Sequence, residues 1–363
     1  MVWRGRPRDF CPLRPLAGAG KISGMPVCRL FLTLLLLAGA CGRVGAAPLF
    51  DEQAVLEVEL IGPLRSVLKS KKERQEFPFV LRVDGRELPL DVRVRGKSRL
   101  EQCRFPPLRL DFDRSETAQT AFAGQNVLKL VTHCSNNSSG ETNLLEEYLA
   151  YRIFNLLSDF SYRVRLLRVH YIDSDDRGER DAGKRYAFVI EPMGQLAARL
   201  DAAPLELAAV PTRKLDAVQA TRVYVFQYLV GNTDWSLVSP RDSEECCHNG
   251  RLVERGEKIF YLPYDFDQAG IVNARYAKPH PVVRLPNVRA RRYRGYCTDP
   301  DDLRAAIRYV NRQQDEIIAL VRSTPGLQGR DAERAVDYLM SYFDKAANED
   351  ELMERFEEKC LGR

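Results

Sequence analysis

The first half of the chain is dominated by segments in which apolar and polar residues alternate, which is the period of a half-buried β-strand. The clearest are residues 54–60 (AVLEVEL) and 77–96 (FPFVLRVDGRELPLDVRVRG). The second contains Asp84-Gly85, a dipeptide typical of two-residue hairpin turns. The pattern predicts a β-rich region over residues 54–96, with further strands at 104–113, 125–133, 163–173 and 185–193. The charged segment 174–184 is expected to join the last two strands as a hairpin loop.

Helical spacing of apolar residues predicts a helix over 143–158, where Leu145, Leu149, Ile153 and Leu156 recur on one face. A second apolar helix is predicted over 216–230 and ends at Gly231, because glycine readily adopts the left-handed conformation that terminates helices. Beyond Leu196 the chain is expected to be mainly helical. That part is interrupted by a short strand at 258–267 and closes with helices near 301–322, 330–346 and 348–360.

This order of elements predicts an α+β fold. Residues 48–195 would form a β-rich lobe with one main helix, and residues 196–363 a mainly helical lobe. Strands segregated from helices favour a cleft between the two lobes as the ligand site.

The composition is that of a folded globular protein, with 45% hydrophobic and 29% charged residues. The formal net charge of +5 does not indicate a nucleic-acid partner. Residues 1–46 contain seven basic residues and one acidic residue, so the remainder has a net charge of −1. Without a basic surplus in that remainder, general binding to nucleic acid through phosphate neutralisation is not expected.

Residues 1–47 are expected to be an upstream extension followed by an export signal that begins at Met25. Arg29 precedes an apolar core at 30–40, and small residues lead to a cleavage site near Ala46 or Ala47. The alternative is a lipoprotein anchor at Cys41, in the sequence AGAC. The core is too short to cross a membrane comfortably, so we expect a periplasmic or extracellular protein with no transmembrane span in the mature chain.

Six cysteines follow the export signal, and an even number in an exported chain predicts disulfides. Their pairing cannot be derived from the sequence. No CxxC pair is present, and the chain has only four histidines, so a structural zinc site is not expected. The six are Cys103, Cys134, Cys246, Cys247, Cys297 and Cys360.

Acidic residues occur at two places where an apolar element ends. Asp234 lies in GNTDWS after the 216–230 helix, and Asp265 and Asp267 lie in YDFD at the end of the 258–267 strand. Two acids at this spacing project to one side of a continuing strand, which suits a divalent cation with oxygen ligands. The alternative is a turn in which Asp265 caps backbone amides.

Two further charged residues occur in otherwise apolar surroundings. Lys129 lies within the strand sequence VLKLV, and Glu147 lies on the helix that follows. We expect them to form an ion pair that holds phosphates, since protein kinases use a lysine, a glutamate and then two aspartates in this order. The alternatives are a lysine that extends to solvent at the sheet edge and a glutamate on a solvated helix face.

Seven motifs, in this order along the chain, resemble the spore coat protein H (CotH) kinase-like family. They are VRVRGKSR, LKL, LLEEYLAYRIFN, FVIEPM, GNTDWS, HNGRL and YDFD, and they span roughly residues 90–275. The resemblance implies an atypical protein-kinase fold that uses ATP and Mg²⁺ or Mn²⁺ to phosphorylate a hydroxyl group. The expected acceptor is a protein or a component of the cell envelope, and the oligomeric state is not predicted.

The resemblance also implies roles for individual residues. Asp234 is expected to be the catalytic acid and Asp265 the metal ligand, with Asn249 and Asp267 as further ligands. The expected nucleotide contacts are Lys129, Glu147, Arg95 in the turn RGKS, and Glu191 in the segment that joins the lobes, where backbone groups would meet adenine.

Two departures from the family pattern leave alternatives open. His248-Asn249 lies behind the extra segment 239–247, so Asn249 would be a ligand only if that segment loops out, held by a disulfide of Cys246 or Cys247. The helix has Glu146-Glu147 where the family has Arg-Asn, and of the two we favour Glu147. The alternatives to a kinase are a non-catalytic, kinase-like binding protein of the envelope and a metal-dependent hydrolase that uses Asp265 and Asp267.

Overall fold

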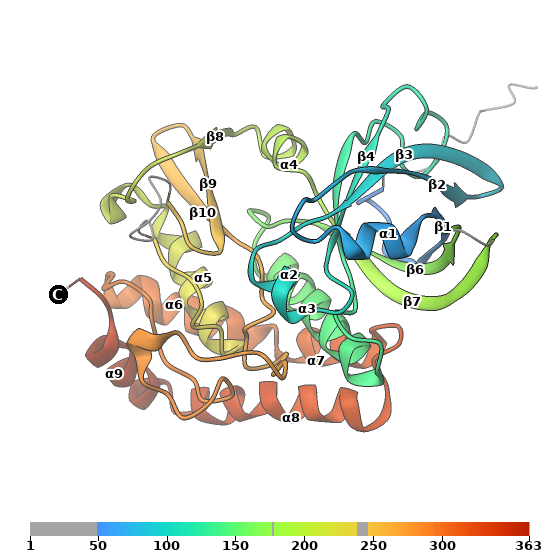
Figure 1. The fold of residues 1–363 in the computed structure, drawn as a ribbon. Coiled ribbons are helices and arrows are strands. Elements are labelled where there is room, and N and C mark those ends of the chain that lie inside the picture. Colours follow the sequence, from blue (N-terminus) through green and yellow to red (C-terminus); the bar gives the residue numbers. More distant parts are fainter. Residues whose placement is uncertain (1–48, 176–177, 238–245, 363) are drawn as a thin grey trace, which may run out of the picture. The chain divides into compact units, whose positions relative to one another are not determined.

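A computed structural model describes residues 49–175, 178–237 and 246–362, all within one unit that spans residues 45–363. The predicted export signal and Cys41 lie outside the described residues. The predicted α+β class is confirmed, because a closed β-barrel is followed by a mainly helical region (Figure 1).

The barrel contains every strand predicted before residue 195. Its order is β1-β2-β3-β4-β5-β7-β6, and it closes through a parallel pairing of β1 with β6. The hairpin at Asp84-Gly85 is confirmed, since β2 and β3 pair up to Val83 and Arg86. The loop predicted at 174–184 is shorter than expected, because Ile172 and Asp173 extend the ladder to Asp181 and Arg180. The strands are β1 (Leu56–Gly62), β2 (Phe77–Val83), β3 (Arg86–Val94), β4 (Leu108–Phe112), β5 (Val127–Val131), β6 (Val164–Asp173) and β7 (Arg180–Ile190).

The main helix, α3 (Ser138–Leu157), begins five residues before the predicted start. Asn137 caps it, with its side-chain oxygen accepting a hydrogen bond from the Gly140 amide, and this cap lies outside the apolar repeat used for the prediction. Helix α3 packs against β6, β7 and α7 (Gln314–Ser323). Three shorter helices accompany the barrel and the segment after it: α1 (Leu64–Lys69), α2 (Ser98–Gln102) and α4 (Met193–Arg199).

The C-terminal region is mainly helical, as predicted, and β10 confirms the strand predicted within residues 258–267, but the two strands that pair with it were not predicted. Strands β8 (Ala203–Leu205), β9 (Gly250–Arg255) and β10 (Lys258–Pro263) pair in the order β10-β9-β8. The predicted 301–322 helix is divided at Gln313, which separates α6 from α7. Besides α7, the helices of this region are α5 (Ala217–Leu229), α6 (Pro300–Arg312), α8 (Gly329–Ala346) and α9 (Glu349–Lys359).

All six cysteines after residue 48 form disulfides, in the pairs Cys103–Cys134, Cys246–Cys247 and Cys297–Cys360. Three disulfides are typical of a protein that matures in an oxidising, extracytoplasmic environment. No helix within the described ranges has the length and apolar character needed to cross a membrane.

Gly231 joins the two segments that carry the predicted aspartates. It follows α5 with a φ of +68°, which confirms the predicted left-handed stop. Its carbonyl accepts a hydrogen bond from the Gly270 amide at 3.1 Å, and the Val230 carbonyl accepts one from the Ile271 amide at 3.1 Å. These bonds hold the loop before Asp234 against the segment after Asp267.

We predict that Gly231→Ala destabilises the protein more than Gly85→Ala does. Both glycines have positive φ, but a Cβ at Gly231 would overlap the Tyr338 hydroxyl, whereas a Cβ at Gly85 meets no atom within 4 Å. Gly85→Ala should cost about 1–2 kcal/mol and Gly231→Ala on the order of 3 kcal/mol. Urea unfolding of both variants measures this, and equal losses would contradict it.

Candidate functional site

Lys129 projects from the outer face of the barrel toward the helical region. In the sheet it lies opposite Arg109 of β4 and Ile190 of β7. Its side chain reaches solvent, and its Nζ lies 5.6 Å from the centre of the Tyr264 ring, next to Asp265. The pKa of Lys129 is lowered to about 8 by partial burial and then by Arg95 and Arg251, while Asp265 raises it. The structure thus brings together Lys129 and Asp265, which are 136 positions apart in the sequence.

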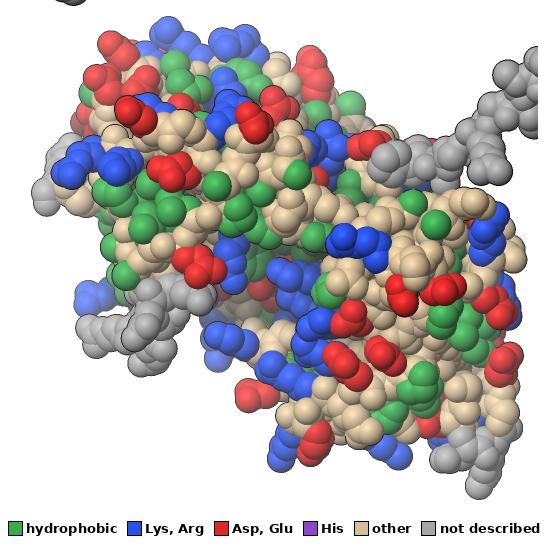
Figure 2. All heavy atoms as spheres, turned by 90° about the horizontal axis from the view of Figure 1, so that it is seen from above, with side chains coloured by type: hydrophobic (Ala, Val, Ile, Leu, Met, Phe, Trp, Pro, Cys, Tyr) green, Lys and Arg blue, Asp and Glu red, His purple; other side chains and the backbone are tan. Residues whose placement is uncertain are grey.

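Lys129 and Arg251 lie near the Tyr264 ring, and Arg95 interacts electrostatically with Tyr264. We call these three side chains the cleft cations. Arg251 lies 5.5 Å from the Tyr264 ring centre. The pKa of Arg95 is lowered by its burial, against the attraction of Asp265. Within the described ranges none of the three forms an ion pair. On the face drawn in Figure 2, Lys and Arg side chains gather around a hollow.

Asp234 is held by the two residues that follow the extra segment. Its carboxylate interacts with His248 Nε2 at 2.8 Å, and Asn249 Nδ2 donates to its Oδ2 at 2.9 Å and to its backbone carbonyl at 2.8 Å. The hydrogen bond to Asp234 raises the pKa of His248. Asn249 therefore does lie beside the catalytic candidate despite the insertion, most of which (238–245) falls outside the described residues. The Cys246–Cys247 disulfide lies directly before His248.

Asp265 adopts a backbone conformation that is uncommon for a residue with a side chain, with a φ of +63°. Its amide donates a hydrogen bond to the Tyr151 hydroxyl at 2.9 Å, so α3 helps to hold it there. Burial and the neighbouring Asp267 raise its pKa to about 6. Local strain of this kind costs about 1–3 kcal/mol and often occurs at functional sites.

Arg99 of α2 binds the carboxylates of Glu147, Asp265 and Asp267, which we call the carboxylate triad. Its Nη2 donates to Glu147 at 2.8 Å and to Asp265 at 3.1 Å, and its Nε donates to Asp267 at 2.8 Å. The predicted pair of Lys129 with Glu147 is therefore wrong, because the ion-pair partner of Glu147 in the described structure is Arg99. Arg99 lies closer to the helix, whereas Lys129 stays on the outer face of the sheet.

The position of Arg99 is fixed by the segment that directly follows its short helix. Cys103 follows α2 and is joined by a disulfide to Cys134, which precedes α3. The Phe105 amide also donates to the Cys134 carbonyl at 3.0 Å. These bonds keep Arg99 against the helix that carries Glu147.

Burial alone would lower the pKa of Arg99, but Asp267 and Glu147 outweigh it and raise the pKa well above its ordinary value. Burial raises the pKa of Glu147, against the attraction of Arg99. One guanidinium does not fully offset three carboxylates in a buried setting.

Glu191 is buried, and its side chain is held by the barrel and by α4. Arg199 binds both carboxylate oxygens, at 3.0 and 2.9 Å, and the Arg163 amide donates to one of them at 3.1 Å. The Glu191 amide donates to the Arg163 carbonyl at 2.9 Å. This amide is therefore hydrogen-bonded within the protein, and the contact of adenine with backbone groups of this segment stays a prediction.

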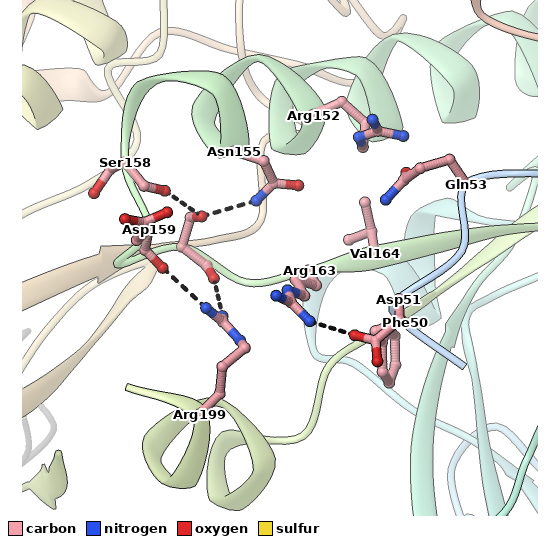
Figure 3. Close-up of a pocket in the computed structure, with 11 residues that line it drawn as sticks. Phe50, Asp51, Gln53, Arg152, Asn155, Ser158, Asp159, Arg163, Val164 and Arg199 are labelled. Carbon is pink, nitrogen blue, oxygen red and sulfur yellow. Dashed lines mark hydrogen bonds and ion pairs between the residues drawn. The ribbon is translucent and has the colours of Figure 1, made fainter. Parts of the chain in front are cut away.

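A hollow of about 260 Å³ near Glu191 is lined by Arg152 of α3, by Arg163, which directly precedes β6, and by Arg199 of α4 (Figure 3). Arg163 is paired with Asp51 at 2.6 Å, and Arg199 also donates to backbone carbonyls of the hollow's wall. None of the predicted site residues lines it.

The predicted metal ligands suit a divalent cation only in part. Among the described residues, no group of three or more His, Cys, Asp or Glu side chains is arranged to hold a metal ion. Asp267 is buried and bound to Arg99, whereas the Asp265 side chain is 42% exposed. Asp265 is thus the accessible oxygen ligand, and a metal there would need further oxygens, such as those of phosphates.

The sequence analysis missed Arg99 and Arg251. Arg99 is one of many arginines in the chain and lies in a five-residue helix without a recognisable periodic pattern. Arg251 lies in β9, a strand that was not predicted. The alternation of apolar and polar residues in GRLVER could have indicated this strand.

Comparison with models of known protein families finds no match, and no curated protein matches the sequence. The roles of the candidate site residues are therefore argued from the distances and charges described above.

Glu146, the other acidic candidate on α3, is 5% exposed and forms no ion pair in the described parts of the chain. Its hydrogen bond is a long one, from Asn143 Nδ2 at 3.4 Å. Burial raises its pKa to about 8.

We predict that the protein loses stability through Glu146 as the pH rises from about 4.5 to about 8. In this range the folded protein keeps the proton that the unfolded chain releases, so the loss approaches about 1.4 kcal/mol per pH unit. Glu146→Gln, which resembles the protonated acid, should remove this dependence. Urea unfolding at pH 5, 6.5 and 8 tests this, and parallel curves for both proteins would contradict it.

Proposed function

We propose that this protein is an exported, metal-dependent phosphotransferase of atypical kinase architecture. It would transfer a phosphoryl group from ATP to a hydroxyl of a protein or envelope acceptor. The proposal agrees with the resemblance of its motifs to the CotH kinase-like family and with the disulfides of an extracytoplasmic protein.

The observation that carries the proposal is the charge pattern around Tyr264 and Asp265. The three cleft cations lack ion-pair partners among the described residues and lie beside an accessible carboxylate. Cations crowded together in a partly buried space lower one another's pKa, so binding a polyanion there is favourable. A triphosphate supplies that charge, and its oxygens would complete the coordination of a divalent cation at Asp265.

The roles of the residues follow from this arrangement. Bound Mg²⁺ or Mn²⁺ would neutralise charge on the transferred phosphoryl group. Asp265 would hold that ion, while Lys129 and Arg95 contact the phosphates. Asp234 would orient the acceptor hydroxyl, with His248 and Asn249 fixing its carboxylate. Catalysis would then consist mainly of placement and charge stabilisation.

We predict that ATP with Mn²⁺ binds the protein and that Asp265→Asn weakens this binding at least about tenfold. The asparagine keeps a hydrogen-bonding oxygen for Arg99 but loses the charge that attracts a metal. Titration calorimetry measures the change, and Asp91→Asn, at an exposed position of β3, is the matched control. Equal heats for the wild type and Asp265→Asn would refute the proposal.

We predict a different result for Asp234→Asn, which should retain ATP binding but lose about 100-fold or more of phosphoryl transfer. In this scheme Asp234 contacts the acceptor hydroxyl and not the nucleotide. Its charge therefore affects the rate of phosphoryl transfer and has little effect on the affinity for ATP. Transfer of radiolabelled γ-phosphate to candidate acceptor proteins measures the activity. An Asp234→Asn protein as active as the wild type would exclude the assigned role.

A non-catalytic, kinase-like binding protein is the second candidate. The observation in its favour is that Arg99 already occupies the carboxylate triad. Nucleotide binding without transfer, across several metals and acceptor classes, would support this function over the first.

A further inference from the structure

The segment between β10 and α6 has an unusual charge. Residues 268–298 contain seven basic residues and no acidic residue, and we call them the basic segment. Residues 47–363 have a net charge of −1, so without the basic segment they have a net charge of −8. An excess of positive charge is therefore confined to this segment. Its basic residues are Arg275, Lys278, Arg284, Arg289, Arg291, Arg292 and Arg294.

Within the described ranges none of these seven side chains forms an ion pair. Two of them bind backbone carbonyls inside the protein: Arg291 donates to Leu229 and Tyr338, and Arg294 donates to Thr233. The other five are exposed. Exposed cations without ion-pair partners favour association with an anionic partner.

The basic segment contacts the loop of the proposed catalytic acid at two places. The His280 amide donates to Thr233 Oγ1 at 3.3 Å, and Arg294 donates to the Thr233 carbonyl. Thr233 directly precedes Asp234, whose side chain is 23% exposed. An acceptor hydroxyl at Asp234 would therefore lie beside the basic segment.

Two of the exposed cations, Arg275 and Arg289, line a hollow of about 260 Å³ between α3 and α8, which we call the α3–α8 hollow. Arg334 also lines it and is paired with Asp331 at 2.5 Å. The second acid of the hollow is Glu146, and burial raises its pKa to about 8, so near neutral pH it offsets little positive charge. The hollow thus offers two guanidinium groups without ion-pair partners in the described structure, which suits a carboxylate.

The α3–α8 hollow and the loop of Asp234 are close along the backbone. Arg275 comes five residues before His280, and Arg289 comes five residues before Arg294. The chain therefore runs twice from the hollow to the contacts with Thr233. Five extended residues span at most about 18 Å, so a bound peptide of about five to eight residues can reach both places.

We propose that the basic segment is the docking surface for an acidic stretch of the acceptor. The acceptor would be a polypeptide with a glutamate or aspartate about five to eight residues from the serine or threonine that is modified. The acidic side chain would bind Arg275 and Arg289 in the α3–α8 hollow and so place the hydroxyl at Asp234. This acceptor class rests on the proposed function.

The partial burial of Asp234 favours a polypeptide over a membrane surface or a nucleic-acid duplex, because an extended chain can reach a recessed carboxylate. The basic segment also carries Val282, which is 75% exposed. A polypeptide supplies both acidic side chains for the arginines and apolar side chains to cover this valine.

The test measures binding of fluorescent peptides by anisotropy, without ATP. Each peptide contains a serine and a short run of glutamates centred about six residues before or after it, and its reference peptide has glutamine in place of glutamate. At low ionic strength one glutamate peptide should bind the wild type at least about tenfold more tightly than its reference, and added salt should reduce the difference.

Arg275→Gln combined with Arg289→Gln should remove most of this preference, whereas lysine at both positions should keep much of it. The matched control combines Arg114→Gln with Lys258→Gln, which removes two exposed cations outside the basic segment and should leave peptide affinity unchanged. Thermal melting checks that each variant is folded. If the double glutamine variant does not fold, Arg275→Gln alone should weaken binding of the glutamate peptide about threefold.

Equal affinities for glutamate and glutamine peptides would overturn the proposal, and so would a preference that the glutamine variants retain. Binding to phosphatidylglycerol vesicles or to DNA, with no preference among the peptides, would also overturn it and assign the surface to another partner.

These peptide affinities do not depend on nucleotide. If the wild type binds no ATP, the proposed function fails, while the preference for glutamate peptides still decides whether the basic segment is a docking surface. If ATP binds and the peptide affinities are equal, the proposed function stands and the acidic acceptor is refuted.

Discussion

The guanidinium of Arg99 joins two parts of the chain whose carboxylates would otherwise repel one another. Glu147 lies on α3, and Asp265 and Asp267 follow β10, so Arg99 connects the barrel-associated helix with the segment that follows the C-terminal sheet. Three carboxylates in a largely buried space would be strongly unfavourable without a cation. The geometry of the candidate site therefore depends on where α2 places Arg99, and the Cys103–Cys134 disulfide fixes that place.

On the other side of the site, around Tyr264, cations outnumber carboxylates. The cleft cations lie close together near Tyr264 without ion-pair partners in the described structure, and burial together with this crowding lowers the pKa of Lys129. Asp265 lies between the two groups, close to Arg99 and within the electrostatic reach of Lys129 and Arg95. Such a division of charge suits a ligand that is itself divided into a metal cation and a polyanion.

The protein places Asp234 beside Asp265 through backbone contacts. Gly231 allows α5 to end where its carbonyl can accept the Gly270 amide, and the close packing with Tyr338 admits no Cβ there. The loop after α5 is then completed by His248 and Asn249, which bind the Asp234 carboxylate. Residues from three separate segments thus share one hydrogen-bonded framework.

The local pattern of apolar and polar residues was enough to predict much of the fold. Alternation in residues 77–96 predicted the β2–β3 hairpin, and apolar spacing predicted α3 and α5, because these signals depend on neighbours within a few residues. In the sheet of β8, β9 and β10 only β10 was predicted; β8 has only three residues and pairs across a separation of about fifty positions. The pairing of strands distant in sequence leaves little trace in the local pattern.

For the site, the sequence by itself determined which acids, amides and cations were available: Asp234, Asp265, Lys129 and Asn249 were all identified from short motifs. Only the tertiary structure decided which of them pair. In the structure Glu147 forms an ion pair with Arg99 and not with Lys129, and the Glu191 amide donates a hydrogen bond to the Arg163 carbonyl. An ion pair depends on distances of a few ångströms between side chains from different elements, and sequence spacing does not specify those distances.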